Sequence, residues 1–510
     1  MIRGALVSGE RVLTRAALLE RAGRAASGFA SLGIGPGAAV AVMLRNDFPF
    51  FEATFAVSRL GAHAVPINWH YLADETRHIL ADSGAKALLV HADLLPQIEG
   101  AVPPGVSVLV VATPPEIRSA YAIDPAQASV PSGCTDWDTW VEGFPESQEP
   151  PRPSGGTMIY TSGTTGRPKG VRRQPTTPEQ MQLGRKIGAE LYGFGPEARA
   201  VLTGPMYHIA PSTFGLVIAA LGDTLVLQSR FDPLELLRLI EAHAVTTLNL
   251  VPTMFIRLLR LSEAERKGFD LSSLTHVVHN AAPCPADVKR AMIEWWGPVI
   301  YELYGGTESG PVTACNSEDW LAHPGTVGRP AEGAVIRILD DDGRELPTGE
   351  VGEVYMRSES ASPFTYHGRE GERRSIERDG FITLGDMGYC DADGYLYLCD
   401  RKRDMVISGG VNIYPAEIEA CLLALPGVAD CAVMGVPDPE FGEALLAVIE
   451  PEPGVELSAE AIRTGLRGKL AGYKVPRRVE FQARLPREDS GKIFKRRLRD
   501  AYWQDTDRRI

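Results

Sequence analysis

The stretch YTSGTTGRPKG, residues 160–170, is the part of the sequence that says most about fold and function. It follows an apolar run at 157–160 that we expect to form a strand. Its glycines permit backbone conformations with φ > 0 and leave room for a ligand. Hydroxyl groups, backbone N–H groups and the positive charges of Arg167 and Lys169 are gathered in one loop, and this composition predicts a polyphosphate site.

Two alternatives to this interpretation can be weighed from the sequence. The loop does not match the G-x-x-x-x-G-K-[ST] pattern of a P-loop, and a flexible Ser/Thr/Gly linker rarely combines so many hydroxyls with Pro168-Lys169-Gly170. A second glycine-rich stretch, 33–37, follows a predicted helix and precedes a predicted strand. That is the wrong order for a dinucleotide-binding turn, so we interpret it as a helix stop.

Helical and strand patterns alternate through the first part of the chain on either side of that helix stop. The helical patterns and the short apolar runs, in chain order, cover residues 13–32, 38–44, 50–60, 63–67, 73–83 and 87–91. This alternation predicts layered, mainly parallel α/β sheets. The proline-rich stretch 101–153 is expected to be an irregular surface excursion.

The pattern changes twice in the second half of the chain. Short strand-like runs broken by Gly, Asp and Pro predict a β-rich subdomain at about 325–400. Helices and strands then return in a segment long enough for a small domain. The predicted division is an N-terminal domain at 1–400, a hinge at 401–404 and a mobile α+β C-terminal domain at 405–510.

Composition and charge narrow the classes of function. The chain has 510 residues and a formal net charge of −13, which argues against nucleic-acid binding because a phosphate backbone calls for a basic surface. The seven cysteines are scattered without a C-x-x-C pair, which favours reduced thiols and a cytoplasmic location over disulfides or a zinc site. We find no signal-peptide pattern, and no apolar run reaches the roughly 18 residues of an integral membrane segment.

A second chemically informative string, YGGTE, lies at residues 304–308. Tyr304 offers an aromatic face to a base, and Gly305 and Gly306 let the backbone approach a nucleotide. Thr307 offers a hydroxyl to phosphate, and Glu308 offers the hard oxygen ligand that Mg²⁺ prefers. Alone this string could be an ordinary turn, so it supports a nucleotide site only in combination with the loop at 160–170.

Together these motifs resemble those of the adenylate-forming superfamily, which includes acyl-CoA synthetases, carrier-protein adenylation domains and luciferases. The resemblance covers about residues 15–500 and depends on the order and spacing of the motifs. It implies that the loop at 160–170 grips the β- and γ-phosphates of ATP, with Mg²⁺ on Glu308 and Thr161. The implied phosphate contacts are Thr161, Ser162, Gly163, Thr164, Thr165 and Lys169.

The resemblance also implies contacts to the adenosine. The segment Asn280-Ala281-Ala282-Pro283 resembles the part of the family that lines the adenine and acyl pockets. Asp386 would accept hydrogen bonds from the ribose hydroxyls, in a segment with Leu384 where the family usually has Thr. Arg401 would reach the ribose or a phosphate.

The resemblance implies further roles near the C-terminus. Arg403 stands at the hinge position, where Asp or Lys is usual. Lys492, in a segment that resembles the P-R-x-x-x-G-K motif, would bridge the carboxylate and the α-phosphate. Lys474 is a candidate for a CoA phosphate contact, with a surface lysine as the alternative. The segment that would admit the pantetheine arm of coenzyme A includes Gly409, Gly410 and Tyr414.

The implied reaction has two steps. The substrate carboxylate attacks the α-phosphorus of ATP and pyrophosphate leaves; after domain rotation the CoA thiol attacks the acyl-adenylate and AMP leaves. His208 would orient groups in the second step, with a structural histidine as the alternative. The acyl-pocket candidates lack a second cation, which predicts an apolar monocarboxylic acid: fatty, aryl or alicyclic. They are His208, Ser212, Phe214, Val251, Asn280 and Gly306.

Three alternatives share the nucleotide motifs. The acyl group could be handed to an acyl carrier protein instead of CoA, although no carrier domain is fused to the chain. A luciferase-type oxidase and a silent nucleotide-binding protein are the others, and the joint presence of Lys169, Glu308, Asp386, Arg401 and Lys492 argues against the silent one. The sequence does not indicate an oligomeric state; the resemblance suggests a homodimer.

Overall fold

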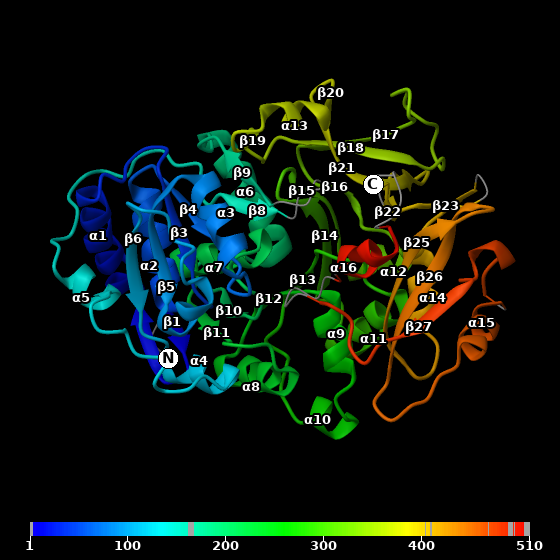
Figure 1. The fold of residues 1–510 in the computed structure, drawn as a ribbon, viewed down its shortest axis with the longest axis horizontal. Coiled ribbons are helices and arrows are strands. Elements are labelled where there is room, and N and C mark those ends of the chain that lie inside the picture. Colours follow the sequence, from blue (N-terminus) through cyan, green and yellow to red (C-terminus); the bar gives the residue numbers. More distant parts are fainter. Residues whose placement is uncertain are drawn as a thin grey trace.

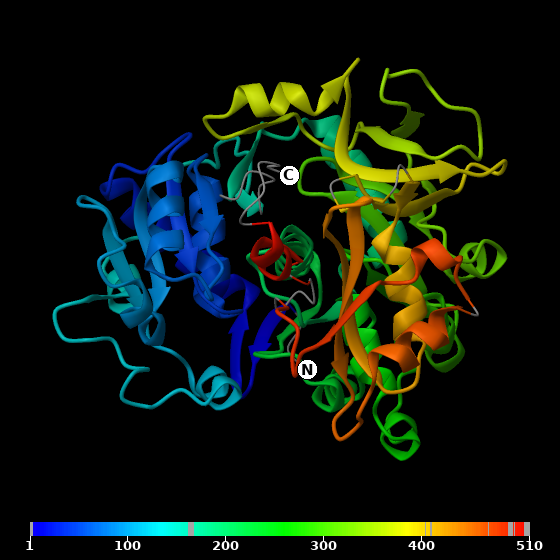
Figure 2. The same cartoon turned by 45° about the vertical axis from the view of Figure 1, so that its right-hand side comes forward.

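The predicted layered α/β fold is confirmed by a computed structural model, which has a large N-terminal domain and a smaller C-terminal domain. The structure describes residues 4–161, 168–402, 404–408, 411–467, 469–487, 493 and 495–503. Figures 1 and 2 show the C-terminal sheet on the opposite side of the molecule from the first layers of the chain.

The largest sheet has nine strands. In spatial order they are β16 (Arg329–Pro330), β15 (Gly310–Cys315), β14 (Ile300–Gly306), β13 (His276–His279), β12 (Thr247–Leu250), β10 (Arg199–Leu202), β11 (Thr224–Leu227), β1 (Ala5–Ser8) and β2 (Arg11–Thr14). The six strands from β14 to β1 are mutually parallel, whereas β2, β15 and β16 are antiparallel to their neighbours. The β1–β2 hairpin, which the sequence pattern did not reveal, forms one edge.

A second sheet is wholly parallel, with strands β4 (His63–Pro66), β3 (Ala39–Met43), β5 (Ala85–His91), β6 (Ser107–Val111) and β7 (Thr135–Asp136). Every residue of β3 is buried, as expected of a strand covered on both faces. The expectation of an irregular excursion at 101–153 is wrong, because that stretch supplies β6 and β7 to this sheet.

Sixteen α-helices accompany the sheets in the described part of the chain. They are α1 (Arg15–Ser31), α2 (Phe48–Arg59), α3 (Ala73–Ser83), α4 (Pro115–Tyr121), α5 (Trp137–Glu142), α6 (Pro178–Tyr192), α7 (Ile209–Leu221), α8 (Pro233–His243), α9 (Pro252–Leu259), α10 (Glu263–Lys267), α11 (Ala286–Trp296), α12 (Ser317–Ala322), α13 (Glu370–Ser375), α14 (Pro415–Leu423), α15 (Ala459–Arg467) and α16 (Lys495–Arg499). Prolines open several of them, and α6 adds a capping box in which Thr177 and Gln180 satisfy each other's backbone N–H. None of the helices in the described ranges is both long and apolar enough to cross a bilayer.

Two small antiparallel sheets extend the large domain. One contains β8 (Ile159–Thr161), β9 (Lys169–Arg173) and β19 (Phe364–Tyr366). The other contains β17 (Ala334–Leu339), β18 (Gly352–Ser358), β20 (Glu377–Arg378), β21 (Phe381–Cys390) and β22 (Leu396–Arg401). The second sheet has the β-rich character expected of 325–400.

The C-terminal sheet contains β23 (Val406–Ser408), β24 (Val411–Ile413), β25 (Val428–Asp438), β26 (Gly442–Pro451) and β27 (Arg478–Phe481). Its strands alternate between two cores, as a period of two requires. Cys431 and Val433 of β25 face the cluster that includes α14 and α15, whereas Ala432 and Met434 face the cluster that includes Leu498.

Candidate active site

The predicted site residues follow the carboxyl ends of neighbouring strands. His208 lies in the connection after β10, Val251 directly follows β12, Asn280 directly follows β13 and Thr307 directly follows β14. These four strands are adjacent and parallel in the nine-stranded sheet. In open α/β sheets the crevice outside the carboxyl ends of the strands is where ligands bind. The fold therefore brings together, at the carboxyl ends of these strands, residues that are up to about a hundred positions apart in the sequence.

Tyr304, Asp386 and Arg401 contact one another near the carboxyl end of β14. The hydroxyl of Tyr304 donates a hydrogen bond to Oδ2 of Asp386 at 2.8 Å, and Nε of Arg401 lies 3.5 Å from Oδ1 of the same carboxylate. Asp386 and Arg401 are register partners on β21 and β22. Burial and the charge of Asp386 raise the pKa of Tyr304 well above its ordinary value, so the phenol remains a donor at neutral pH.

The hairpin after β14 requires its glycines for space. A Cβ on Gly305 would lie 2.1 Å from the carbonyl oxygen of Gly310, and a Cβ on Gly306 would lie 2.7 Å from Cδ1 of Leu384. The amide of Gly306 donates to Oγ of Ser309 at 2.9 Å. Gly306 thus faces the leucine that departs from the family motif, and its role in the acyl pocket stays a prediction.

Lys169 and Glu308 are joined through Tyr366 on β19. The hydroxyl of Tyr366 donates to Oε1 of Glu308 at 3.0 Å, and Nζ of Lys169 lies 5.0 Å from the centre of the Tyr366 ring. Lys169 is 8% exposed and forms an ion pair with Glu372 of α13. A largely desolvated ammonium beside one carboxylate is suited to bind an anion that displaces this partner.

Arg173 is a site residue that the sequence did not reveal. Its guanidinium donates to the carbonyl oxygens of Thr307 and Glu308 at 2.7 and 3.0 Å, and to that of Ser362 at 2.6 Å. It therefore fixes the backbone just beyond β14 from the β9 strand. Its targets are main-chain carbonyls 134 and 135 positions away, so no local motif could have indicated the contact.

The segment 280–283 contains a strained residue. Ala281 has φ = +70°, a conformation that an L-residue with a Cβ adopts only at a cost. Nδ2 of Asn280 lies 3.5 Å from the hydroxyl oxygen of Tyr192, and Asn280 is 8% exposed. Ala282 and Pro283 follow in the turn before α11. Non-glycine residues with positive φ cluster at ligand sites, which is consistent with the predicted role of this segment.

The acyl-pocket candidates differ in their surroundings. Phe214 packs against the rings of Tyr192 and Phe194, with centroids 5.9 and 5.8 Å away, inside a hydrophobic core. Ser212 is fully buried, and its Oγ has no hydrogen-bond partner among the described residues. The ring of His208 lies 4.5 Å from that of Tyr207. Phe214 contributes mainly to packing, whereas Ser212 and His208 lie at the start of α7, near the strand ends.

The C-terminal candidates lie in the junction and in the small domain. Tyr414 precedes α14, and Nζ of Lys474 contacts both carboxylate oxygens of Glu417, at 2.8 and 2.6 Å.

In the predicted phosphate loop of the large domain, Thr161 is the last residue of β8. Eight predicted residues lie outside the described part of the chain, so their geometry stays a prediction: Ser162, Gly163, Thr164, Thr165, Arg403, Gly409, Gly410 and Lys492.

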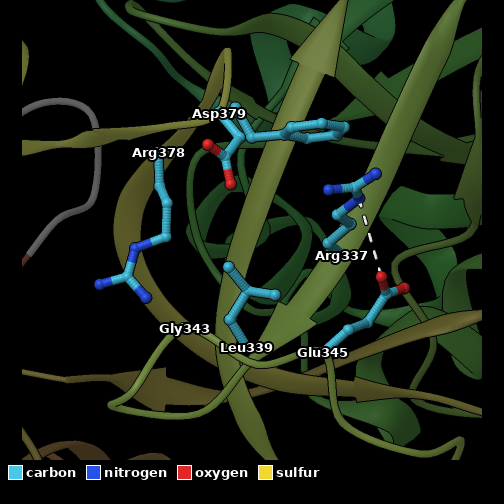
Figure 3. A pocket seen from close by; sticks show the side chains of 7 residues that line it. Arg337, Leu339, Gly343, Glu345, Arg378 and Asp379 are labelled. Atoms are coloured by element: carbon cyan, nitrogen blue, oxygen red, sulfur yellow. Dashed lines mark ion pairs between the residues drawn. The ribbon is translucent and has the colours of Figure 1, made fainter.

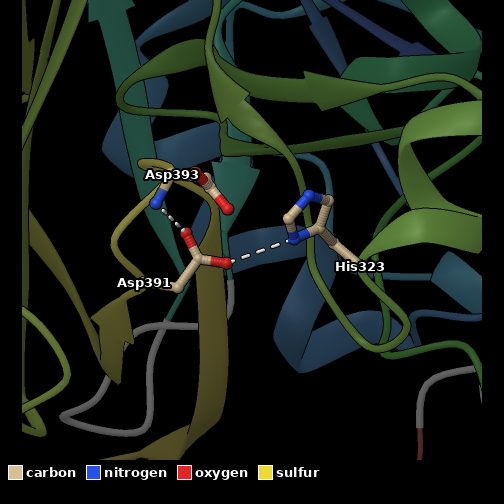
Figure 4. Close-up of side chains that lie close together, drawn as sticks. All are labelled: His323, Asp391 and Asp393. Atoms are coloured by element: carbon tan, nitrogen blue, oxygen red, sulfur yellow. Dashed lines mark hydrogen bonds and ion pairs between the residues drawn. The ribbon is translucent and has the colours of Figure 1, made fainter.

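Two further groups of polar residues do not join this site. A cavity of about 230 Å³ is lined by Arg337, Arg378 and Asp379, among others, in the β-rich region, and contains none of the predicted residues (Figure 3). His323, Asp391 and Asp393 cluster elsewhere (Figure 4). There Asp391 accepts the backbone N–H groups of Asp393 and Tyr395 at 3.0 and 2.9 Å, which is the bonding of a turn.

Comparison with known proteins identifies the family. Residues 3–363 match the family described as AMP-binding enzyme, and residues 417–492 match the AMP-binding enzyme C-terminal domain. This chain belongs to the AMP-binding enzyme family. The resemblance to adenylate-forming enzymes is thereby confirmed.

Relatives and solved structures agree with this membership. The chain is 34% identical to a feruloyl-CoA synthase from Amycolatopsis sp. over 96% of its own length and 94% of the relative's. It is 32% identical to the fatty acid–[acyl-carrier-protein] ligase ScoC of Streptomyces coeruleorubidus, over 98% and 93%. It superposes on o-succinylbenzoate CoA synthetase of Bacillus subtilis, solved with an acyl-adenylate intermediate, with a TM-score of 0.80 and 28% identity, covering 97% and 95% of the two chains.

Proposed function

We infer that this protein is an ATP-dependent acid–CoA ligase, which forms an acyl-adenylate and then an acyl-CoA thioester. The observation that carries the proposal is the convergence of Lys169, Tyr304, Glu308 and Asp386 at one sheet edge of an AMP-binding enzyme. The whole-length similarity to CoA ligases supports the choice of acceptor.

In the proposed first step, the nucleotide is held by the large domain. Asp386, oriented by Tyr304, would accept the ribose hydroxyls, and segment 280–283 would line the adenine. Lys169 would exchange Glu372 for a phosphate oxygen, which neutralises charge on the leaving pyrophosphate. Lys492 would bridge the carboxylate and the α-phosphate as the new P–O bond forms.

The residues present fit a magnesium ion beside the phosphates. Glu308 offers a carboxylate whose Oε1 is already hydrogen-bonded to Tyr366, and hard oxygen donors of this kind suit Mg²⁺. We propose Glu308 and Thr161 as its neighbours. When bound, the ion would neutralise phosphate charge.

In the proposed second step, the C-terminal domain turns about residues 401–404. The division at 1–400, 401–404 and 405–510 is supported by the end of β22 at Arg401 and the start of the C-terminal sheet at Val406. The turn would withdraw Lys492 and bring Gly409, Gly410 and Tyr414 to the site. His208 would then orient the thioester-forming groups, and Lys474 would leave Glu417 for a CoA phosphate.

We propose an apolar monocarboxylic acid as the substrate, either fatty, aryl or alicyclic. The pocket candidates Ser212, Val251 and Gly306 are small or apolar, and none of the candidates is a Lys or Arg that would hold a second carboxylate. The free state of the cysteines supports a cytoplasmic location. We propose that the enzyme forms a homodimer, which light scattering would test.

An acyl carrier protein is the second candidate acceptor. The observation in its favour is the whole-length similarity to a fatty acid–[acyl-carrier-protein] ligase. The two acceptors present the same phosphopantetheine thiol, so the chemistry of the second step does not distinguish them.

The test is pyrophosphate release with ATP, Mg²⁺ and a panel of acids, with and without CoA. The panel includes ferulic, benzoic, octanoic, palmitic, cyclohexanecarboxylic and malonic acids. We expect release with one class of monocarboxylic acid, acyl-CoA only when CoA is added, and loss of release in Lys492→Ala. Lys469→Ala, an exposed lysine of the same domain, is the matched control and should retain activity.

Three results would change the proposal. An acyl-adenylate that CoA does not consume, but a phosphopantetheinylated carrier protein does, would favour the second acceptor. Thioesters from malonic acid alone would contradict the proposed substrate class. Absence of pyrophosphate release with every acid, combined with no ATP binding by calorimetry, would refute the proposed function.

A further inference from the structure

A buried charged cluster lies inside the large domain, next to the proposed nucleotide site but outside it. Lys289 on α11 is 0% exposed, and its Nζ lies 2.6 Å from Oε2 of Glu302 on β14. Glu302 is 6% exposed. His279, the last residue of β13, is 0% exposed, and its Nε2 lies 3.5 Å from the same carboxylate oxygen. We call Lys289, Glu302 and His279 the buried triad.

The surroundings of the triad are apolar or weakly polar. Nζ of Lys289 lies 5.0 Å from the ring centre of Trp320 and 4.0 Å from Sγ of Cys315. Neither ring nitrogen of His279 has a hydrogen-bond partner among the described residues. Moving two charges out of water into such a place is costly, and an apolar pair of similar volume often serves stability as well or better. Stability alone is therefore a poor explanation of the triad.

The position of the triad suggests what it does. Glu302 and His279 are register partners on adjacent parallel strands, and α11 carries Lys289. The residue after His279 begins the segment 280–283, and α11 begins soon after that segment ends. Two residues beyond Glu302, the chain reaches Tyr304. The triad therefore joins the three elements from which the adenine segment and the YGGTE segment emerge.

We propose that Lys289, Glu302 and His279 are positioning residues for the nucleotide pocket. The ion pair ties α11 to β14, and His279 packs beside the same carboxylate, so that segments 280–283 and 304–308 keep a fixed separation. This inference rests on the proposed function, because the pocket that the triad shapes is the proposed site for ATP. None of the three side chains touches the nucleotide in this account.

The closing experiment compares the same substitution at two buried carboxylates. Glu302→Gln removes the negative charge of the triad and leaves that of Lys289 without its partner. Glu52→Gln is the matched control, because Glu52 on α2 is 2% exposed and accepts from Arg21 and Trp137 at 2.6 and 2.8 Å. Each variant is measured for unfolding temperature, for the Kd of ATP by calorimetry, and for kcat and the KM of ATP in pyrophosphate release.

We expect both variants to lose stability, but only Glu302→Gln to raise the Kd and the KM for ATP, by about tenfold, because misplaced pocket walls weaken binding. A purely structural role would lower the unfolding temperature of both variants and leave the Kd for ATP unchanged at temperatures where they are folded. An unchanged Kd in folded Glu302→Gln would overturn the inference.

A second variant keeps the test decisive if Glu302→Gln does not fold. Lys289→Met/Glu302→Met replaces the pair by two apolar chains of similar length, a change that is often neutral for stability. We expect it to fold and to bind ATP about tenfold more weakly than wild type. Wild-type affinity in this variant would overturn the inference. Failure of the wild type itself to bind ATP would instead refute the proposed function.

Discussion

The proposed nucleotide site and the junction with the C-terminal domain are built from different contacts. At the site, part-buried hydrogen bonds hold neighbouring elements together: Tyr304 to Asp386, Tyr366 to Glu308, and Arg173 to the backbone beyond β14. At the junction, the amide of Ala416 donates to Asp400 at 2.8 Å, and the guanidinium of Arg260 donates to the carbonyl oxygen of Ala429 at 3.0 Å in an exposed contact.

The site has many hydrogen bonds that fix its elements in place, and the junction has contacts that water can reach. We therefore propose separate tasks for the two regions. A pocket that must stabilise developing charge gains from dipoles already in place, because no reorganisation is then needed during the reaction. The proposed rotation of the C-terminal domain between two half-reactions needs contacts at the junction that can be broken and remade. Burial raises the pKa of Asp400 above its ordinary value, because desolvation disfavours the charged form. The predictions below separate the two regions.

The largest expected effect is that of Lys492→Ala. Loss of the cation that we propose at the α-phosphate should slow acyl-adenylate formation by at least about a hundredfold, because a charge in the transition state is left without its partner. Thioester formation from added acyl-adenylate should be little changed, since the proposed domain rotation withdraws the residue before that step. Quenched-flow assays of the two steps check this, and equal losses in both would contradict the division of tasks.

The next effect is that of Asp386→Ala. The substitution removes the proposed ribose acceptor, and the hydroxyl of Tyr304 loses its partner at 2.8 Å. We expect the KM for ATP to rise roughly ten- to a hundredfold, the range of one or two hydrogen bonds to a charged group, with a smaller change in the KM for the acid. Asp391→Ala, on an exposed turn of the same region, is the control. A KM for ATP unchanged by Asp386→Ala would remove the ribose assignment.

A pH-dependent effect is expected from Asp47, the N-cap residue of α2. Burial alone would raise its pKa, but the hydrogen bond from His91 and the charge of Arg11 lower the pKa of Asp47 below its ordinary value. A lowered folded-state pKa contributes stability above the unfolded value of about 3.9 and loses it as the pH falls further.

Asp47→Asn should therefore destabilise the protein by about 1 to 3 kcal/mol at pH 7, and by less below about pH 4. Urea unfolding at pH 7 and at pH 3.5 measures this, while nucleotide affinity at pH 7 should stay the same. If Asp47→Asn destabilised the protein more at pH 3.5 than at pH 7, this result would contradict a lowered pKa of Asp47 in the folded state.

The smallest effect is expected at Lys402 in the hinge. Its Nζ contacts Asp341 and Glu353 at 2.8 and 3.1 Å, but its side chain is 42% exposed and that of Asp341 90% exposed. Exposed ion pairs contribute little, so Lys402→Met should change the free energy of unfolding by less than about 1 kcal/mol. A larger loss, read from urea unfolding, would mean that the junction is more rigid than proposed.

Some features could be predicted from the sequence because they depend on local patterns. The alternation of helices and strands predicted the layered fold, and Tyr304 and Asp386 lie in short strings whose chemistry is visible unaided. Features built from distant residues were missed. Arg173 binds carbonyls more than a hundred positions away, and the Lys289–Glu302 pair spans a helix and a strand. The strands β6 and β7 were missed because they lie between the many prolines of 101–153, which favoured an irregular segment.

The most direct test of the central claim follows an oxygen atom. A substrate acid identified in the panel is labelled with ¹⁸O in its carboxylate, incubated with ATP, Mg²⁺ and CoA, and the AMP is analysed by mass spectrometry. Attack of the carboxylate on the α-phosphorus predicts one ¹⁸O in AMP, because the acyl–oxygen bond breaks when the thiol attacks. Unlabelled AMP, or ADP with labelled phosphate, would contradict the acyl-adenylate mechanism.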